Sequence, residues 1–548
     1  MTDQQHPYLL KRLERLNAIG VALSAERDNK RLLEMILLGA KEITNADGGT
    51  LYTIIDNKQL KFEIMSNKTL NLAMGGTTGK EIPFLPLPLY LEDGSPNLTT
   101  VAAYATLNDK TVNIANAYQA QDFDFAGTRK FDEKTGYHSQ SFLTIPMKNH
   151  EDEIIGVLQL INAIDIDTNE IIPFSAANQR LVESLASQAA VAMTNQDLIK
   201  GLKGLFEAFI ELMAEAIDQK SPYTGGHCRR VPELTMMLGQ AAIDTKTGPL
   251  KDFTLNEKEF YELKIAGWLH DCGKVITPES VMDKPTKLSA IFDRINLIDQ
   301  RFELLKSQAE CDLLKKQLAA LQSSKSGNGQ AESISKLVLA CEAFKAKCDD
   351  DRDFLRKSNF GSERMTPEDQ QRILDIATYT IINAEGKPEA FLSENEVYNL
   401  NIVRGTLTAE EREIINNHIV VTINMLDSLP YPNDLKRVPE YACGHHERMD
   451  GRGYPKGLTR EQMSVPARVL GIADIFEALT SKDRPYKKAK TLSESLHILG
   501  KMKLDHHIDP DLFDIFVREK IYLKYAHEFL EPEQIDEVDE TKIPGYQP

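Results

Sequence analysis

Histidine and aspartate side chains recur between residues 227 and 474, and this series constrains the fold more than any other feature of the chain. Its members include two adjacent pairs and are His227, His270-Asp271, His418, His445-His446 and Asp474. Imidazole nitrogens and carboxylate oxygens bind zinc, manganese or iron, and two such ions close together can hold a phosphodiester. The series therefore predicts a fold that gathers these side chains into a hydrolytic site with two metal ions.

The two ions can be assigned expected ligands. Asp271 is the natural bridging residue, because one carboxylate offers two oxygens. The expected remaining ligands fall into two groups, which are His227, His270 and Asp474 for one ion and His418, His445 and His446 for the other. A water held between the ions would have a lowered pKa and could attack phosphorus near neutral pH.

Two further features are expected to act on the substrate. Lys274 follows Asp271 by three positions, so its ammonium should lie near that carboxylate and meet a phosphate oxygen. A tight loop, fixed by Gly451, Gly453 and Pro455, is expected to bring Tyr454 to the substrate or to a partner. The neighbouring Glu447 and Asp450 are expected to brace this loop rather than to bind metal.

Composition limits the class of protein. A length of 548 residues predicts two to four domains, at about 150 residues each. The net charge of −18 argues against duplex nucleic acid as a partner, which requires a basic surface. No apolar run is long enough to span a membrane and the N-terminus lacks a signal-peptide core, so a cytoplasmic protein is expected. The six cysteines form no C-x-x-C pair, which indicates neither a disulfide framework nor a thiolate zinc site.

The N-terminal third has the pattern of an α+β domain. Residues 9–46 have helical periodicity and end in a run of turn-forming residues. Short apolar segments separated by polar loops then predict strands, namely Thr50–Ile55, Leu60–Ile64, Thr111–Ile114, Ser141–Met147 and Ile154–Ile161. A long helix is expected to begin near Phe174 and to continue to about Lys220. Helix, antiparallel strands and exit helix together favour a sensor domain.

This region resembles a GAF domain over about residues 10–195. The resemblance is carried by three segments, Asn113–Tyr118, Phe131–Tyr137 and Ile154–Asn162, the last being the strand under the ligand pocket of such domains. The run Lys130–Glu133 is similar to one in the cyclic-nucleotide-binding GAF domains of phosphodiesterases. The resemblance implies either a small-molecule ligand at this domain or a role in dimerisation and relay.

The helix expected over residues 175–220 has an imperfect heptad pattern. Its apolar positions are Leu181, Leu185, Ala189, Ala192, Leu198, Leu202, Leu205 and Phe209. Such a pattern predicts a parallel coiled-coil connector in a homodimer, and the alternative is packing of the helix onto its own domains.

After Lys220 the pattern is all helical. Two charged, leucine-bearing segments, 293–322 and 331–357, flank the Ser/Gly-rich run 323–330. They predict an antiparallel helical hairpin within an insertion at residues 289–406.

The histidine-rich region resembles an HD-GYP domain over about residues 205–530, apart from that insertion. Besides His270-Asp-Cys-Gly-Lys274, the motifs are His445-His446-Glu followed by Asp450-Gly-Arg-Gly-Tyr-Pro455, Arg468–Asp474 and Asp483–Lys487. The resemblance implies an all-α phosphodiesterase that opens cyclic di-GMP to linear pGpG or GMP, and iron as the first choice of metal over manganese or zinc. It also implies that Arg484 and Lys487 bind phosphate.

One departure from this family bears on the number of metals. Members thought to hold three metals carry a glutamate four residues before the first histidine, where this chain has Tyr223. Tyrosine is a poor ligand for hard metals, so two ions are favoured.

Two alternative functions stay open, and both share the same expected domain organisation. The substrate can be another cyclic dinucleotide, such as cyclic GMP-AMP, or the chain can be a signalling scaffold that binds a nucleotide with little catalysis. The expected boundaries are a GAF domain at 1–174, a connector at 175–220, an HD-GYP domain in two parts at 221–288 and 407–548, and the insertion at 289–406.

Overall fold

The chain divides into two compact units, residues 1–206 and 207–548, in a computed structural model. The structure describes residues 5–220, 226–322, 328–361, 364–482 and 489–547. Tyr223, the Ser/Gly-rich segment 323–327, Arg484 and Lys487 lie outside these described residues. Within the described ranges, no helix combines the length and the apolar character that crossing a membrane requires.

The first unit is built on one antiparallel sheet with the order β3-β2-β1-β7-β6-β5. Strand β4 pairs with β2, and β8 pairs with β7. The strands are β1 (Ala46–Ile55), β2 (Gln59–Asn67), β3 (Leu72–Gly75), β4 (Leu87–Pro88), β5 (Val112–Ile114), β6 (Phe142–Lys148), β7 (Ile154–Ile164) and β8 (Ile171–Ile172). The five strands that the sequence predicted are thereby confirmed.

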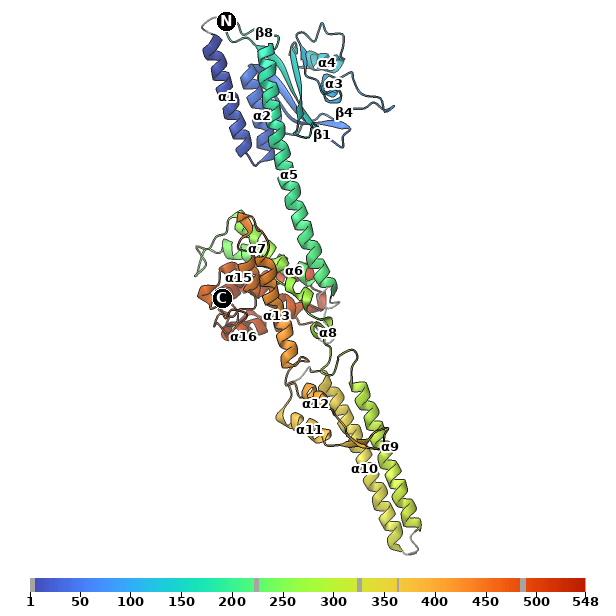
Figure 1. Ribbon diagram of the computed structural model, residues 1–548. Coiled ribbons are helices and arrows are strands. Elements are labelled where there is room, and N and C mark those ends of the chain that lie inside the picture. The colour runs from blue at the N-terminus through green and yellow to red at the C-terminus, as the bar shows by residue number, and fades with distance from the viewer. Residues whose placement is uncertain (1–4, 221–225, 323–327, 362–363, 483–488, 548) are drawn as a thin grey trace. The chain divides into compact units, whose positions relative to one another are not determined.

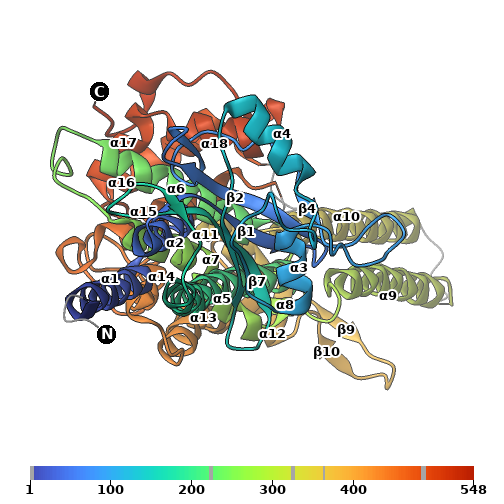
Figure 2. The same ribbon diagram turned by 90° about the horizontal axis from the view of Figure 1, so that it is seen from above.

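Helices cover both faces of this sheet. Helices α1 (Gln5–Ala25), α2 (Asn29–Thr44) and the first part of α5 (Ala176–Lys220) lie side by side on one face (Figure 1). Their shared core consists of leucine, isoleucine and alanine side chains from the three helices and from the sheet. Helices α3 (Val101–Asn108) and α4 (Ala126–Thr135) lie across the sheet from them (Figure 2). The α+β prediction for this unit is confirmed.

The stretch with helical periodicity over residues 9–46 forms two helices, α1 and α2. Asp28 is extended (φ −84°, ψ 118°) and accepts a hydrogen bond from the amide of Arg31, which caps α2. The Glu26 carboxylate accepts the amides of Arg27 and Asp28 at 2.8 and 2.9 Å. These side chains accept hydrogen bonds from backbone amides, and such bonds compete with those of a helix. Helix α1 therefore ends before Glu26.

The second unit contains a bundle around α6 (His227–Asp244), which contacts α7, α15, α17 and α18. Its remaining helices are α7 (Glu257–Leu269), α8 (Glu279–Met282), α13 (Ala409–Asp427), α14 (Val438–Cys443), α15 (Val465–Thr480), α16 (Leu492–Leu504), α17 (Pro510–Arg518) and α18 (Ile521–Phe529). Short 3₁₀ turns are η1 (Cys272–Ile276), η2 (Asn433–Leu435), η3 (Arg460–Gln462), η4 (Pro532–Gln534) and η5 (Glu540–Lys542). The bundle core is fully buried at Leu234, Phe476 and Phe513, among others.

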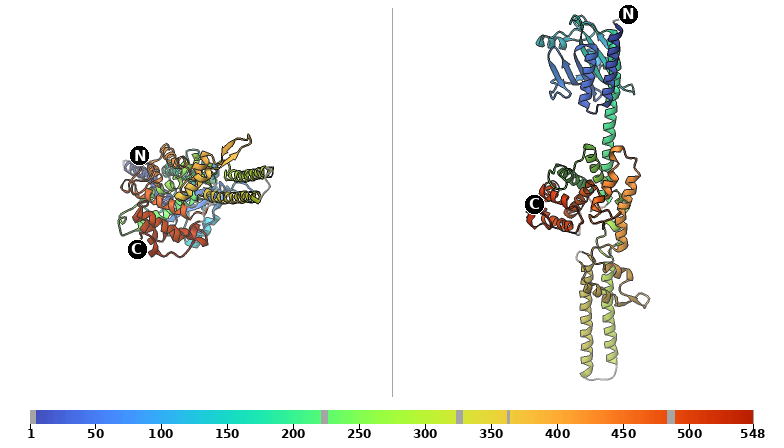
Figure 3. Two further views of the ribbon diagram at one scale, coloured as in Figure 1. Left: turned by 90° about the horizontal axis from the view of Figure 1, so that it is seen from below. Right: turned by 90° about the vertical axis from the view of Figure 1, so that its left-hand side faces the viewer.

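The region between α8 and α13 has a core of its own. Helices α9 (Ile295–Gln322) and α10 (Asn328–Asn359) pack against each other (Figure 3). Helices α11 (Pro367–Ala377) and α12 (Glu394–Leu400) and a strand pair, β9 (Thr380–Ile382) and β10 (Pro388–Ala390), complete it. Buried residues at the base of the helix pair, including Phe302, Leu355 and Phe391, form its centre.

The strand pair β9–β10 contradicts the expectation of helices alone after Lys220. Its turn is held by Asn383, whose side-chain oxygen accepts the amides of Glu385 and Lys387 at 3.0 Å each. Gly386 adopts φ 77°, a left-handed conformation that glycine takes without strain. A turn of this kind joins two short extended segments without a helix.

Candidate metal centre

The seven residues singled out from the sequence converge in the second unit. They come from the start of α6 (His227), the end of α7 (His270), the turn into η1 (Asp271), the middle of α13 (His418), the segment after α14 (His445, His446) and the middle of α15 (Asp474). All but His446 and Asp474 are buried, and these two are partly buried. Their ligand atoms form three groups, and the atoms within each group lie within 4.8 Å of one another. Two of these groups are the sets expected around the two ions, one set for each ion.

Close packing of η1 on α13 brings Asp271 to His418. Gly273 donates its amide to the Thr422 hydroxyl at 2.9 Å. A Cβ at Gly273 would meet the His418 carbonyl oxygen at 2.0 Å, so the approach requires glycine. Close packing against α13 thus explains why the His-Asp-Cys-Gly-Lys motif has a glycine at this position.

The two oxygens of Asp271 face different histidines. Oδ2 lies 3.3 Å from Nε2 of His227 and 3.3 Å from Nε2 of His270. Oδ1 lies 3.3 Å from Nε2 of His418. Asp474 Oδ1 is 3.4 Å from His227 Nε2, and the His418 and His446 Nε2 atoms are 3.2 Å apart. This is the arrangement that a carboxylate shared between two ion sites requires.

Unpaired polar atoms at the centre fit metal ligation. The buried atoms His227 Nε2, His270 Nε2, Asp271 Oδ1 and His445 Nε2 have no hydrogen-bond partner among the described residues. His270 Nδ1 donates to the Gly267 carbonyl at 2.8 Å, and His445 Nδ1 donates to the Ala442 carbonyl at 2.6 Å. Because Nδ1 carries the proton in this tautomer, the Nε2 lone pair is left for a ligand. The donor set, imidazoles with carboxylates, suits iron, manganese or zinc.

Charges divide the centre into two halves. Burial opposes a charge on His227, but Glu477 and Asp271 outweigh it and raise the pKa of His227 to about 10. His270 is likewise opposed by burial, and Asp271 raises its pKa to about 9. In contrast, burial lowers the pKa of His446 to about 4 and that of His445 well below its ordinary value. His227 and His270 therefore hold protons at neutral pH, whereas His445 and His446 are neutral imidazoles.

Lys274 also lies at the centre. Its Nζ forms an ion pair with Asp271 Oδ2, as the three-residue spacing predicted. Burial opposes its charge, yet Asp271 and Asp474 raise the pKa of Lys274 above the ordinary lysine value. The side chain is therefore an ammonium at neutral pH, and it faces the carboxylate that the two histidine groups share.

Glu477 is a buried residue of the site that the sequence analysis missed. It accepts a hydrogen bond from His227 Nδ1 and another from Arg230 Nε at 2.7 Å. A carboxylate on the far nitrogen of a ligand histidine fixes the ring orientation and its tautomer. In the sequence, Glu477 could have been noticed only because it follows Asp474 by three residues and so lies on the same face of α15.

The end of α5 also contacts the residues that hold the centre. The Asp218 carboxylate accepts the amides of Gly226 at 3.0 Å and Cys228 at 3.3 Å, at the start of the helix that begins with His227. Lys220 Nζ donates to the carbonyl oxygens of Lys274, at 3.3 Å, and Val275. No motif in the sequence pointed to these two contacts.

The loop after His446 is braced as expected. Glu447 accepts the amides of Lys456 at 2.8 Å and Leu458 at 2.9 Å, across the loop. Tyr454 stacks on His446, with ring centroids 4.8 Å apart and planes 17° from parallel. A Cβ at Gly453 would lie 2.4 Å from backbone atoms of Glu447, so glycine is required there. The loop thus places Tyr454 beside the second histidine group.

Comparison with known sequences identifies two domain families. A sequence model of the GAF domain matches residues 28–193, and one of the HD domain matches residues 394–512. The HD match contains four candidate ligands, which are His418, His445, His446 and Asp474. The chain carries both domains, as its sequence motifs predicted.

Relatives with assigned activities match only part of the chain. A 3'3'-cGAMP-specific phosphodiesterase of Vibrio cholerae is 42% identical over 81 residues, which are 15% of this chain and 19% of that protein. A cyclic di-GMP phosphodiesterase of Pseudomonas aeruginosa is 37% identical over 114 residues, which are 21% of this chain and 26% of that protein. The chain therefore spans only about a fifth to a quarter of the length of these two relatives.

A solved structure matches the first unit weakly. The GAF domain of a phosphoenolpyruvate-protein phosphotransferase from Coxiella burnetii is 15% identical, with a TM-score of 0.27, and the match covers 35% of this chain and 98% of that structure. A likeness of this strength says nothing about function.

Proposed function

We propose that this chain, which joins a GAF domain to an HD domain, is a metal-dependent phosphodiesterase that hydrolyses cyclic di-GMP to linear pGpG, GMP or both. The observation that supports this most is Asp271, whose two oxygens face separate histidine groups at 3.3 Å. Two divalent ions bound by these groups would supply Lewis acidity toward the phosphate and lower the pKa of the attacking water. Iron is the first choice, with manganese or zinc as alternatives.

The proposed ligands are the seven residues of the centre, with Asp271 shared. Lys274 would neutralise charge that develops on the phosphate, since its ammonium already lies against Asp271. Its position on η1, a turn fixed against α13, keeps this cation in place during the reaction.

Substrate contacts are proposed for two segments. Tyr454, held by Gly453 and Pro455 in the braced loop, lies beside His446 and can stack on a base or meet a phosphate. Arg484 and Lys487, which lie outside the described residues, are proposed to bind phosphate because of their place in the HD-GYP motif.

A second substrate has support of its own. The Vibrio cholerae relative is named for 3'3'-cGAMP, so a cyclic GMP-AMP is the alternative substrate for this chain. The two nucleotides differ only in a base, and both require the same opening of a phosphodiester. A binding scaffold with little catalysis is the remaining alternative, in which the centre holds the nucleotide without cleaving it.

One experiment separates these three functions. Protein purified without air is analysed for metal and is incubated under reducing conditions with iron or manganese and each cyclic dinucleotide, and the linear products are separated by chromatography. We expect bound metal and faster opening of cyclic di-GMP. Faster opening of cyclic GMP-AMP would assign the alternative substrate, and binding without products would assign the scaffold.

A variant tests the site within the same experiment. Replacing His270→Ala together with Asp271→Ala removes ligands from both ion sites and should abolish metal binding and product formation. Asp427→Asn, an exposed change on α13, is the control and should alter neither. Activity retained in the double variant would rule out the assigned centre.

Regulation is proposed to pass from the GAF domain through α5 in a homodimer. Helix α5 runs unbroken from Ala176 to Lys220 and ends in the contacts of Asp218 and Lys220 beside the centre. A ligand at the GAF domain would act by changing the position of this helix.

A further inference from the structure

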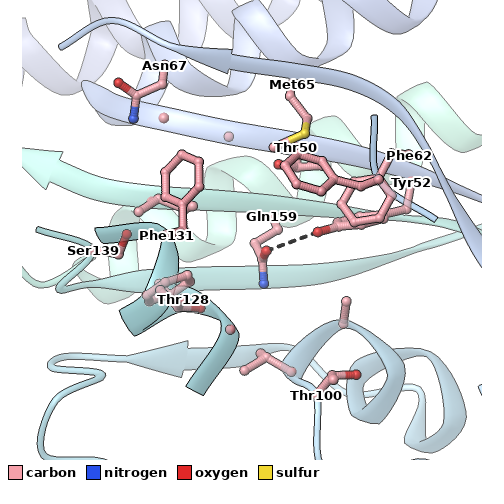
Figure 4. Close-up of a pocket in the computed structure, with 18 of the residues that line it drawn as sticks. Thr50, Tyr52, Phe62, Met65, Asn67, Thr100, Thr128, Phe131, Ser139 and Gln159 are labelled. Atoms are coloured by element: carbon pink, nitrogen blue, oxygen red, sulfur yellow. Dashed lines mark hydrogen bonds between the residues drawn. The ribbon is translucent and has the colours of Figure 1, made fainter. Parts of the chain in front are cut away.

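A cavity of about 490 Å³ lies in the GAF domain. Strands β1 and β7 line it with Thr50 and Gln159, and β2 contributes Phe62 (Figure 4). Residues of α3 and α4, among them Ala102 and Thr128, line it as well. Its volume is within the range of about 300–1,000 Å³ that holds small-molecule ligands in proteins.

Aromatic rings contribute to the cavity lining from several elements. Its aromatic members are Tyr52, Phe62, Phe84, Phe125, Phe131, Tyr137 and Phe142. Tyr52 and Phe62 pack with centroids 4.8 Å apart, and Figure 4 shows Phe131 on the other side of Gln159 from this pair. Aromatic rings on two sides of one cavity can stack on a planar ring, which favours such a ring as the ligand.

Gln159 offers hydrogen bonds to such a ring. Its Nε2 donates to Thr144 Oγ1 at 3.0 Å, and its Oε1 accepts from the Tyr52 hydroxyl at 3.3 Å. These bonds orient the amide, and they leave one N–H and one lone pair for another partner. An amide with a free donor and a free acceptor pairs with the edge of a nucleobase. The Thr100 hydroxyl, also in the lining, is buried without a hydrogen-bond partner among the described residues.

Charge argues against a phosphate in this cavity. No lysine, arginine or histidine belongs to the lining, which is formed wholly by described residues, whereas the Asp124 carboxylate does. Lys41 reaches the lining only through Ser66, to which it donates at 2.9 Å, and burial lowers the pKa of Lys41. An anion taken from water into this cavity would therefore lose hydration without gaining a cation.

The segment that is similar to cyclic-nucleotide-binding GAF domains does not change this balance. Phe131 of that segment lines the cavity, but Lys130 is exposed and is not part of the lining. Asp132 accepts the Tyr118 hydroxyl at 2.7 Å and the Ser139 amide at 2.8 Å, so it braces the domain. The segment thus contributes a ring and no cation. The N-termini of two helices, α3 at Val101 and α4 at Gly127 and Thr128, are the lining features that favour an anion.

We propose that this cavity binds an uncharged planar nitrogen heterocycle of the nucleobase type, which stacks against its rings and pairs with Gln159, in preference to an anionic nucleotide. This names the ligand class for the sensory role proposed above. Because the test measures binding alone, its failure can be told apart from a failure of the catalytic proposal.

Isothermal titration calorimetry of the full chain tests the preference. Guanosine and adenosine are compared with guanosine and adenosine 3',5'-cyclic phosphates, which carry the same bases and one added anion. We expect at least one nucleoside to bind about tenfold or more tightly than its cyclic phosphate. Gln159→Leu should weaken that binding by about tenfold or more, because the base edge then loses its partner.

Two further variants keep the result interpretable. Gln119→Leu, an exposed change of the same kind, should leave binding unchanged. Phe84→Ala removes a ring that is 44% exposed, so the domain should stay folded while the nucleoside binds more weakly. Equal or tighter binding of the cyclic phosphate would place an anion at the N-terminus of α3 or α4 and overturn the proposal, as would the absence of binding by both nucleosides.

Discussion

At the level of single residues, Glu477 determines how His227 faces the metal centre. The carboxylate is buried between the His227 ring and the Arg230 guanidinium. Glu477→Gln keeps the size of the side chain but removes the charge that fixes the ring. We expect metal affinity to fall by about 10- to 100-fold. Metal retained per chain after dialysis against a competing chelator measures this effect.

The control for Glu477 is an exposed glutamate on another helix of the bundle. Glu413→Gln on α13 makes the same chemical change away from the centre and should leave the metal content unchanged. Circular dichroism of both variants checks that the fold is kept. If Glu477→Gln retains metal as tightly as the parent chain, another contact orients His227.

A pH dependence of metal binding follows from the two halves of the centre. The raised pKa values of His227, about 10, and His270, about 9, mean that both rings are protonated at neutral pH without metal. Metal must displace these protons, so affinity should rise with pH by about tenfold per unit for each proton released. His446, with a pKa lowered to about 4, is already neutral and should contribute no such dependence.

Calorimetry with manganese between about pH 7 and pH 9 measures this dependence, and buffers of different ionisation enthalpy count the protons released. The same raised pKa values stabilise the metal-free fold below the ordinary histidine pKa of about 6.5, and this stabilisation is lost as pH rises through 9 to 10. Affinity that does not change with pH would mean that neither ring holds a proton.

The sequence allowed the candidate ligands to be predicted because their residue types are rare and partly adjacent. The pairs His270-Asp271 and His445-His446 have few other uses in a chain of ordinary composition. Glu477 and Asp218 could not be found in this way, because acidic residues are frequent on helices and only packing decides which of them face the centre. The metal assignment and the roles of Arg484 and Lys487 stay predictions.

At the level of elements, the end of α5 caps the helix that begins with His227. Asp218 accepts the amides of Gly226 and Cys228, which otherwise lack helical partners. Asp218→Asn should lower the free energy of unfolding by about 1 kcal/mol, because a cap is weakened. It should also lower metal affinity through the position of His227, and thermal unfolding together with metal analysis measures both effects.

Asp197→Asn, an exposed change on the same helix, is the control for Asp218. It should alter neither quantity. A variant at Asp218 that loses stability but keeps its full metal affinity would separate the cap from the centre and would remove α5 as a direct route to it.

Most elements were predictable from periodicity, and the exceptions have local causes. The break between α1 and α2 depends on Glu26 and Asp28 bonding to nearby amides, a competition that apolar spacing does not reveal. The strands β9 and β10 are three residues each, too short for a periodic pattern. The boundaries proposed for the domains stay predictions at this level.

The distal half of the α9–α10 pair should be dispensable for metal binding. The buried residues Phe302, Leu305, Cys348 and Leu355 lie near the base of the pair. Replacing residues 309–342 by a Gly/Ser linker of about six residues spans the gap between packed helices. We expect unchanged metal content, and metal analysis of the purified variant measures it.

Lys284→Met provides the contrasting variant. Its Nζ donates to Glu411 on α13 at 2.8 Å and to Asn399 on α12 at 3.0 Å, so it joins the inserted region to the helix that carries His418. This change should reduce metal content, because it removes the cation from the partly buried Glu411 carboxylate and the donor from the buried Asn399 amide. Loss of metal in the truncated chain but not in Lys284→Met would reverse the roles assigned to these two parts.

At the level of the whole molecule, α5 presents two apolar faces. Ile210, Ala214 and Ile217 are buried on one of them. The other bears Leu198, Leu202, Leu205, Phe209 and Leu212, which are 58–69% exposed. Their alternating spacing of four and three residues is that of a coiled-coil seam. The first half of the predicted heptad, including Leu185 and Ala189, instead packs within its own unit.

The exposed seam predicts that the full chain is a parallel dimer through α5. Asn195 continues the stripe three residues before Leu198, where a polar residue fixes the register of a two-stranded coil. Leu202→Glu with Leu205→Glu should convert the dimer to a monomer, because charges would face each other across the seam. Light scattering coupled to size-exclusion chromatography measures the mass of each variant.

Metal content and mass together distinguish a broken seam from a misfolded chain. The double variant should keep its metal, because α5 contacts the centre through Asp218 and Lys220 rather than through the seam. Lys200→Glu, which reverses a charge at an exposed position of the same helix outside the stripe, should remain a dimer. A parent chain that is monomeric at every concentration would contradict the seam, and any signal from the GAF domain would then have to travel within a single α5.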